Sequence, residues 1–238
     1  MSGHVTGTYQ SAARVREMFG RVAPRYDFLN HLLSMNIDRL WRHAVAREFR
    51  DILSRPGARA LDLCCGTGDL TLTLEESGPL EVIGADFCHP MLVLAQEKLK
   101  RKSGFVEADA LQLPFADASF DLVTIAFGYR NLADYPGGLR EMLRLLRPGG
   151  RLGILEASHV TGILGPAYRF YLSEVLPRIG ALISGDAMAY GYFAKTVERF
   201  PEADELAEDM RAAGFSDVRY RRFTFGIAAL HSGTRVAG

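Results

Sequence analysis

The sequence predicts an α/β fold, in which a mostly parallel sheet carries helices on both faces. Over residues 57–157, short apolar segments alternate with segments of helical periodicity. A glycine-containing turn, Gly66-Thr67-Gly68, directly follows the first apolar segment. Strands and helices that alternate at this spacing form parallel sheets with crossover helices. Because ligands of such sheets bind beyond the carboxyl ends of the strands, the residues at those ends are candidates for the functional site.

Five apolar segments are expected to form the strands of this core: 60–64, 82–85, 105–108, 121–126 and 152–156. Helices with apolar residues on one face are expected from Trp41, from Asp69, from Pro90 and over 139–146. Proline suits the first turn of a helix because the N–H that it lacks would have no partner there. Pro56-Gly57 and Pro148-Gly149-Gly150 are expected to end the first and the last of these helices.

The length of 238 residues and the hydrophobic content of 48% suit one domain with one sizeable core. We divide this domain into three segments. An N-terminal helical segment over 10–53 is expected to act as a lid, and 57–157 to form the ligand-binding core. Residues 158–238 begin helical and are expected to end with two closing antiparallel strands.

Bulk composition bears on partners and location. Lys plus Arg and Asp plus Glu both total 28, so the chain lacks the basic excess of nucleic-acid-binding proteins, and we expect no nucleic-acid partner. None of the three cysteines has a CxxC spacing, which indicates reduced thiols and no metal centre. Residues 1–10 lack a signal-peptide pattern, and no apolar run reaches the roughly 18 residues of a spanning helix, so we expect a soluble, cytoplasmic protein.

Polar residues follow three strands in a row and predict an adenosine-type ligand. The turn at Gly66 and Gly68 lets a ligand approach the backbone, although such turns also serve packing alone. Asp86 ends the second strand, where a carboxylate accepts hydrogen bonds from a ribose diol. Asp109-Ala110 follows the third strand, where a carboxylate would receive an adenine amino group. For either acid alone, a solvated loop position or a helix cap remains an alternative.

A nicotinamide dinucleotide is the competing ligand. Its fingerprint requires a third glycine, which lets the helix pack closely on the strand, and Thr71 occupies that position. The turn and the downstream Asp109 therefore favour S-adenosylmethionine as the cofactor.

Several segments carry a family resemblance. Residues 60–70 (ALDLCCGTGDL) resemble motif I of the class I methyltransferases. Residues 26–41 (YDFLNHLLSMNIDRLW), 127–131 (FGYRN) and 144–158 resemble further signatures, and 226–231 a C-terminal pattern, of the bacterial quinone-biosynthesis C-methyltransferases. That family comprises the demethylmenaquinone methyltransferases and the 2-polyprenyl-6-methoxy-benzoquinol methylases. The resemblance covers almost the whole chain.

The resemblance implies a Rossmann-like class I methyltransferase fold with a mostly parallel seven-stranded sheet. Together with the strand-end residues it gives the expected cofactor contacts: Asp62, Gly66, Thr67, Gly68, Asp86, Phe87, Met91, Asp109, Ala110 and Ala126. Ala126 stands where the family often has serine, so one cofactor hydrogen bond is absent or made by backbone. Ala189 and Gly191 replace the usual Ser and Arg in the acceptor region, which puts the identity of the acceptor in question.

Three residues are expected to take part in catalysis. A ring carbon of a quinol becomes more nucleophilic when the adjacent hydroxyl loses its proton. We expect Arg130 and Asn131, just beyond the fourth strand, to hold a ring oxygen and to favour its anionic form. The alternative is that Arg130 pairs with an acid and fixes the loop. Tyr26 is expected to cover the cofactor or the acceptor as part of the lid, with a core position as its alternative.

The function predicted from these features is C-methylation of a lipid-tailed quinol, with demethylmenaquinol favoured over the benzoquinol of ubiquinone biosynthesis. A small phenolic or secondary-metabolite acceptor, a non-catalytic cofactor-binding scaffold and an NAD-dependent oxidoreductase are the alternatives. Residues 163–193 are apolar enough to form a slot for a polyprenyl tail, although an ordinary helix pair would look the same. A lipid acceptor also predicts transient peripheral membrane contact, at the inner face of the membrane. A homodimer is left open.

Overall fold

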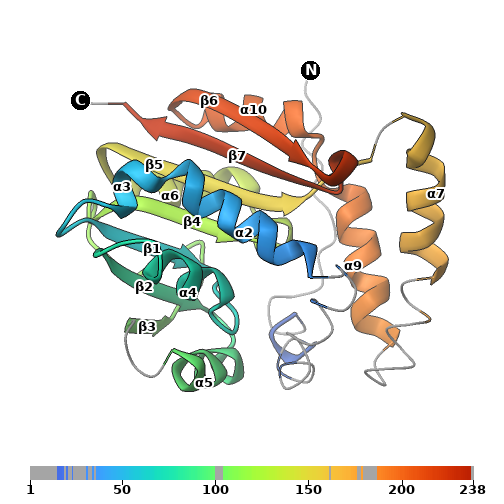
Figure 1. Ribbon diagram of the computed structural model, residues 1–238, viewed down its shortest axis with the longest axis horizontal. Helices are drawn as coiled ribbons and strands as arrows, with labels where there is room; N and C mark the ends of the chain where they lie inside the picture. The colour runs from blue at the N-terminus through green and yellow to red at the C-terminus, as the bar shows by residue number, and fades with distance from the viewer. Residues whose placement is uncertain are drawn as a thin grey trace.

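The computed structural model describes residues 15–18, 20, 23, 31, 34, 36–99, 104–160, 162–175, 178 and 187–236. Its centre is a seven-stranded sheet in the order β3-β2-β1-β4-β5-β7-β6 (Figure 1). The strands are β1 (Arg59–Leu63), β2 (Glu81–Asp86), β3 (Gly104–Glu107), β4 (Phe120–Ala126), β5 (Leu146–Ala157), β6 (Phe215–Phe223) and β7 (Ala228–Arg235).

Strands β1 to β5 are parallel, whereas β7 runs antiparallel to both β5 and β6. The prediction of a mostly parallel sheet closed by two antiparallel strands is therefore confirmed. From β1 the chain adds β2 and β3 on one side and returns to place β4 on the other side. This reversal of strand order opens a crevice beyond the carboxyl ends of β1 and β4, where ligands of open α/β sheets bind.

Helices cover both faces of the sheet. The longer ones are α2 (Ile37–Glu48), α4 (Asp69–Glu75), α5 (His89–Lys98), α6 (Tyr135–Leu145), α9 (Ala187–Arg199) and α10 (Ala203–Ala212). Shorter helical segments are α3 (Arg50–Leu53), η1 (Tyr129–Asn131), η2 (Gly162–Leu164), α7 (Gly165–Phe170), η3 (Tyr171–Val175) and η4 (Thr224–Gly226). Figure 1 shows α7 and α9 standing beyond the carboxyl ends of the parallel strands. None of the helices in the described part of the chain is long and apolar enough to cross a membrane.

Most element boundaries lie within one residue of the sequence prediction, but the starts of α2, α6 and β5 differ by more. Helix α2 begins at Ile37 instead of Trp41, directly after Asn36 in the left-handed conformation. The segment Pro148-Gly149-Gly150 does not end helix α6, which already stops at Leu145. It lies within β5, because Leu146 pairs with Phe120 before a register shift carries the strand past the turn. A bulge of this kind lets a strand accommodate residues that would interrupt a regular ladder.

The core consists of two main apolar clusters, one on each face of the sheet. The predicted stripe of α2 and α3 belongs to one of them: Trp41, Val45, Phe49, Ile52 and Leu53 are all buried. Leu139 and Met142 of α6 belong to the other, together with Leu206 of α10. The ring of Phe49 presses on β5 so closely that a Cβ on Gly153 would lie 2.5 Å from it. Glycine at this position therefore lets α2 and α3 approach the sheet.

Candidate active site

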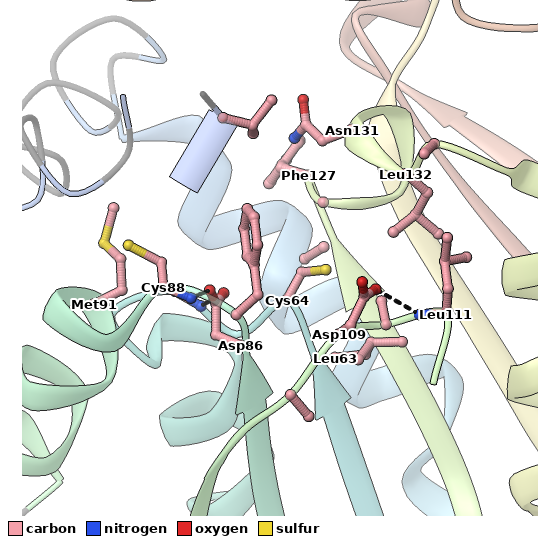
Figure 2. Close-up of a pocket in the computed structure, with 18 of the residues that line it drawn as sticks. Leu63, Cys64, Asp86, Cys88, Met91, Asp109, Leu111, Phe127, Asn131 and Leu132 are labelled. Atoms are coloured by element: carbon pink, nitrogen blue, oxygen red, sulfur yellow. Dashed lines mark hydrogen bonds between the residues drawn. The ribbon is translucent and has the colours of Figure 1, made fainter. Parts of the chain in front are cut away.

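A cleft lies beyond the carboxyl ends of β1, β2 and β4, at the predicted reversal of strand order (Figure 2). It encloses about 980 Å³, part of which is open to solvent. Seven of the expected cofactor contacts line it: Gly66, Asp86, Phe87, Met91, Asp109, Ala110 and Ala126. Side chains from distant parts of the chain complete the lining, among them Asn131 of η1 and Tyr192 of α9.

The turn after β1 brings backbone to the edge of this cleft. Gly66 and Gly68 have φ values of 55° and 83°, which favour glycine. A Cβ on Gly66 would meet nothing within 4 Å, so the backbone there is open to a ligand. A Cβ on Gly68 would lie 2.8 Å from a side-chain atom of Leu99. Gly68 therefore packs closely on the end of α5, and it is not among the residues that line the two recesses. The expected cofactor contact at Gly68 stays a prediction.

Asp86 connects the end of β2 to this turn. One carboxylate oxygen accepts a hydrogen bond from the Gly66 amide at 2.9 Å, and the other accepts one from the Cys88 amide at 2.8 Å. Burial raises the pKa of Asp86, while these amide donors oppose the rise. The carboxylate is thus held in a fixed orientation at the cleft. Carboxylate oxygens have further lone pairs, so both amide bonds are compatible with a hydroxyl donor from a ligand.

Asp109 lies on the opposite side of the cleft, just beyond β3 (Figure 2). One of its carboxylate oxygens accepts a hydrogen bond from the Leu111 amide at 2.9 Å, which forms a local turn. Its side chain is exposed, whereas the neighbouring Ala110 is buried in the cleft wall. Asp109 thus makes the local hydrogen bond expected of a loop acid, and it also lines the cleft. The local bond leaves the carboxylate able to accept a hydrogen bond from a ligand.

A second recess adjoins the cleft and shares Cys64, Gly66, Ala126 and Phe127 with it. It is lined by Asp62 and Thr67, two more of the expected cofactor contacts. Asp62 accepts a hydrogen bond from the Thr71 hydroxyl at 2.6 Å, and burial raises its pKa to about 7. Thr71 stands where the dinucleotide fingerprint requires its third glycine, and its side chain makes a buried hydrogen bond there. This agrees with the choice of S-adenosylmethionine over a nicotinamide dinucleotide.

Charged side chains surround this second recess. Asp69 lies 2.7 Å from the Lys98 ammonium and 3.4 Å from the Arg42 guanidinium. Burial alone would raise the pKa of Asp69, but Arg42 and Lys98 outweigh it and hold the pKa below its usual value. Lys98 also donates a hydrogen bond to Thr67 at 3.2 Å. A recess with a carboxylate and two cations beside each other is complementary to the zwitterionic end of an amino acid.

Two cysteines that the sequence analysis did not place in the site line the walls of these recesses. Cys64 lines both recesses, and Cys65 lines the second. Burial, followed by nearby carboxylates, raises the pKa of both thiols well above the usual value. Both thiols are free, as expected, and are protonated at neutral pH. Their position between the first strand and the glycine-containing turn is visible in the sequence, but the φ of 52° at Cys64 is not.

The expected catalytic residues occupy three different situations. Asn131 lines the cleft, and its carboxamide oxygen is buried with no hydrogen-bond partner among the described residues. Arg130 does not line the cleft: its guanidinium is 2.6 Å from Glu156 of β5 and lies over the ring of Phe193. The structure thus shows the ion pair that was the alternative for Arg130, and a direct contact of Arg130 with the acceptor stays a prediction. Tyr26 lies outside the described residues.

The cleft fits an adenosine-type methyl donor on grounds of its own geometry. Two carboxylates lie on it, backbone is exposed at Gly66, and a charged recess continues it on one side. On the other side the buried, unpartnered oxygen of Asn131 marks a place for a second ligand group. Such an arrangement suits two ligands that meet within one cleft.

Comparison with known proteins decides the family. Residues 8–235 match the model of the ubiE/COQ5 methyltransferase family. The chain belongs to this family. It is 50% identical over 226 residues to the demethylmenaquinone methyltransferase of Deinococcus radiodurans, covering 93% of this chain and 92% of that protein. It is 51% identical over 223 residues to that of Thermus thermophilus, covering 92% of this chain and all of that protein. This member of the ubiE/COQ5 family is therefore a methyltransferase, and the prediction of S-adenosylmethionine as its cofactor is confirmed.

Solved structures agree on the fold. A SAM-dependent methyltransferase from Thermotoga maritima has a TM-score of 0.68 at 21% identity, over 92% of this chain and 98% of that chain. The cyclase SpnF has a TM-score of 0.71 at 18% identity, over the whole of both chains. Because this fold also serves a cyclase, the fold alone does not give the reaction, and the family match carries that conclusion.

Proposed function

We propose that this protein methylates a ring carbon of a polyprenylated quinol, converting demethylmenaquinol to menaquinol with S-adenosylmethionine as the donor. The observation that carries the proposal is one cleft that joins an adenosine-type half to a half lined by Asn131, Leu132 and Tyr192. Two relatives with the name demethylmenaquinone methyltransferase, each about half identical over nearly the whole chain, support the choice of acceptor.

In this proposal the two recesses divide the methyl donor between them. Asp86 would hold the ribose hydroxyls, and Asp109 with Ala110 would hold the adenine. Thr67, Asp62 and the charged pair of Arg42 and Asp69 would surround the amino-acid end. Phe87, Met91 and Ala126 would supply apolar walls. When bound, S-adenosylmethionine supplies a sulfonium-bound methyl group that is already activated for transfer.

Asn131 is the proposed catalytic residue on the acceptor side. Its unpartnered carboxamide oxygen is an acceptor for a ring hydroxyl, and its amide N–H groups are donors for a ring oxygen that has lost its proton. Either bond would orient the ring, and the second would stabilise the anion that makes the adjacent ring carbon nucleophilic. The acceptor and a closed cleft would together exclude water.

Arg130 is a positioning residue in this proposal. Its guanidinium donates to the Glu156 carboxylate and, at 2.5 Å, to the Phe127 carbonyl oxygen, while its own amide donates to Glu156 at 3.1 Å. These bonds hold both ends of the segment 127–131, on which Asn131 lies. Contact of the guanidinium with the ring of Phe193 also ties this segment to α9.

The N-terminal segment 10–53 is proposed to close the cleft, with 57–157 as the cofactor-binding core and 158–238 as the acceptor side. Val15 lies in the cleft wall, which supports the role of the first segment. Tyr192 of α9 supports the role of the third. Gly191 leaves open space, since a Cβ there would meet nothing within 4 Å, and this would give room for a bulky acceptor.

A comparison of acceptors tests the proposal. Purified protein would be given S-adenosylmethionine with reduced demethylmenaquinone, a demethylated benzoquinol or a small phenol, each with a short tail or none. We expect the highest kcat/KM for the naphthoquinol. Equal or greater kcat/KM for the benzoquinol would move the proposal to ubiquinone biosynthesis, and a preference for the phenol would contradict a quinol acceptor. An Asp86→Ala variant is the control for transfer that depends on this cleft.

A further inference from the structure

Large apolar side chains are exposed at one end of the molecule. Ile163 of η2 is 98% exposed, Phe225 of η4 is 80% exposed and Leu40 of α2 is 63% exposed. Single exposed apolar residues are ordinary on protein surfaces, but a group of large ones marks an interaction site. These three residues belong to segments that are far apart in the sequence, and contacts between the segments show whether they lie near one another.

Contacts among neighbouring residues bring these segments together. The Trp41 indole N–H donates to the Thr224 hydroxyl at 3.1 Å, which joins α2 to η4. A Cβ on Gly226 would lie 3.0 Å from the His159 carbonyl oxygen, so η4 also rests against the chain that leads into η2. Leu40 and Thr224 line one surface groove. Figure 1 shows the turn between β6 and β7 at the end of the sheet where the parallel strands have their carboxyl ends.

The backbone of η4 holds its phenylalanine outward at a conformational cost. Thr224 and Phe225 have φ values of 48° and 57°, which bulky residues rarely adopt. Phe225 does not pack into the core in exchange, since most of its surface is exposed. Positive φ at consecutive residues is required by the tight turn that joins the antiparallel strands β6 and β7, and this turn presents Phe225 to solvent.

Basic residues lie around the groove that Leu40 and Thr224 line. Arg39 and Arg47 lie on the exposed side of α2, and Arg221 of β6 lines the same groove as Leu40 and Arg47. No carboxylate of the described residues pairs with any of these three arginines. The nearby Glu48 is already paired with Arg151 and Arg219, at 2.7 Å each. The net charge of the chain is zero, so this local excess is a property of one surface.

The same surface is continuous with the wall of the cleft. Trp41, next to Leu40, has its ring centroid 6.0 Å from that of Phe127. Phe127 lines both the main cleft and the adjoining recess. Trp41 and Phe127 therefore connect the helix that carries Leu40 to the wall of the cleft.

We infer that Leu40, Phe225 and Ile163 with Arg39, Arg47 and Arg221 form a docking face for an anionic lipid bilayer. The inference rests on the proposed function, because an acceptor with a polyprenyl tail resides in a bilayer. Apolar side chains would enter the headgroup boundary, and arginines would bind anionic headgroups. The face would hold the cleft beside the membrane, so that the quinol ring enters the site while its tail stays in lipid.

Vesicle binding tests the docking face directly. The full chain would be sedimented with vesicles of phosphatidylcholine and phosphatidylglycerol in equal parts, and with vesicles of phosphatidylcholine alone. We expect at least about tenfold tighter binding to the anionic vesicles, weakened by salt. The double variant Arg47→Gln/Arg221→Gln should bind about thirtyfold more weakly, at the contribution usual for two basic residues. Leu40→Gln/Phe225→Asn should bind at least about tenfold more weakly, and asparagine tolerates the backbone of residue 225.

Matched controls lie elsewhere on the surface. Val93 on α5 is 40% exposed, and the Arg55 side chain is 56% exposed near the amino-terminal ends of β1 and β4. Val93→Gln/Arg55→Gln should bind vesicles as the unmodified protein does. Equal binding of all variants, or binding to both vesicle types alike, would overturn the docking face. Ultracentrifugation tests whether a second copy of the chain binds this face instead of a membrane. A dimer that only the Leu40→Gln/Phe225→Asn variant failed to form would also overturn the proposed membrane docking.

Activity with two forms of the acceptor separates this inference from the proposed function. The docking variants should methylate a soluble, short-tailed quinol as fast as the unmodified protein, but a long-tailed quinol in anionic vesicles at least about tenfold more slowly. Failure of the unmodified protein on the short-tailed quinol would contradict the proposed function, whatever the vesicle binding. Equal rates of all proteins on the vesicle-borne quinol would contradict only the docking face.

Discussion

Arg130 and Glu156 form a buried ion pair directly beneath the cleft, with 2.6 Å between guanidinium nitrogen and carboxylate oxygen. Both side chains are almost inaccessible, at 5% and 1% exposure. Glu156 also accepts hydrogen bonds from the amides of Arg130 and Ala157. The pair therefore connects η1 to the end of β5 and fixes the segment that carries Asn131.

Breaking this pair should affect stability and turnover together. Glu156→Gln leaves the Arg130 charge buried without its counterion, which should destabilise the fold by about 3–5 kcal/mol. Arg130→Ala should lower kcat strongly, while the affinity for S-adenosylhomocysteine stays near normal because Arg130 does not line the cleft. Chemical denaturation and calorimetry measure these two effects.

The double variant Arg130→Met/Glu156→Leu separates a positioning role from a merely structural one. Replacing both charges by apolar groups should recover most of the stability that Glu156→Gln loses. Turnover should stay low, because the bonds to Phe127 and to the amide of residue 130 would still be missing. Recovery of full kcat in the double variant would show that the pair serves stability alone.

Asn131→Ala tests the acceptor side of the site. Loss of a hydrogen bond to a developing anion should reduce kcat by about tenfold to a hundredfold, at the roughly 1.5–3 kcal/mol of a charge-assisted bond. Because Asn131 is a lining residue with an unpartnered oxygen, its removal should not disturb the fold, and the unfolding transition should change little. Steady-state kinetics with saturating methyl donor give the result. Unchanged kcat would remove Asn131 from the catalytic residues.

Asp86→Asn tests the proposed ribose contact. The substitution keeps the shape but removes the charge, so cofactor affinity should fall by about tenfold or more. The introduced carboxamide retains one acceptor oxygen for the Gly66 or Cys88 N–H, which limits the damage to the turn. Isothermal titration with S-adenosylmethionine measures the affinity. An affinity equal to that of the unmodified protein would contradict the ribose contact.

Local periodicity and turn residues predict the first strand and its turn, the proline in the first turn of α5 and the buried stripe of α2 and α3. The position of Asp86 at the cleft follows from the same pattern. Arg130 shows the limit of this approach: its loop was located correctly, but its partner Glu156 lies 26 positions away on another strand. Likewise, the left-handed backbone at Cys64 and Phe127 depends on tertiary packing, and no local sequence pattern predicts it.

His231 predicts a pH dependence of stability. Its imidazole N–H donates to the Ala203 carbonyl oxygen at 2.8 Å, and burial lowers its pKa to about 4. Between pH 6.5 and 4 the unfolded chain therefore binds this proton and the folded chain does not. His231 thus removes stability as the pH falls through this range, by about 3 kcal/mol in all.

Asp62 acts in the opposite direction, since its pKa is raised to about 7 and the folded chain binds a proton below that pH. The test is therefore the difference between the unmodified protein and His231→Gln. The difference between their free energies of unfolding, measured by denaturant titration, should become smaller or change sign as the pH falls from 7 to 4.5. If this difference in the free energy of unfolding is the same at both pH values, burial does not lower the pKa of His231 as proposed.

Location of the transferred methyl group tests the central claim most directly. S-adenosylmethionine with a carbon-13-labelled methyl group would be incubated with the protein and reduced short-tailed demethylmenaquinone, and the product examined by nuclear magnetic resonance and mass spectrometry. We predict one label per product molecule, bonded to a ring carbon, and loss of transfer in Asp86→Ala. Label on a ring oxygen, or no transfer by well-folded protein that binds the donor, would contradict a quinol C-methyltransferase.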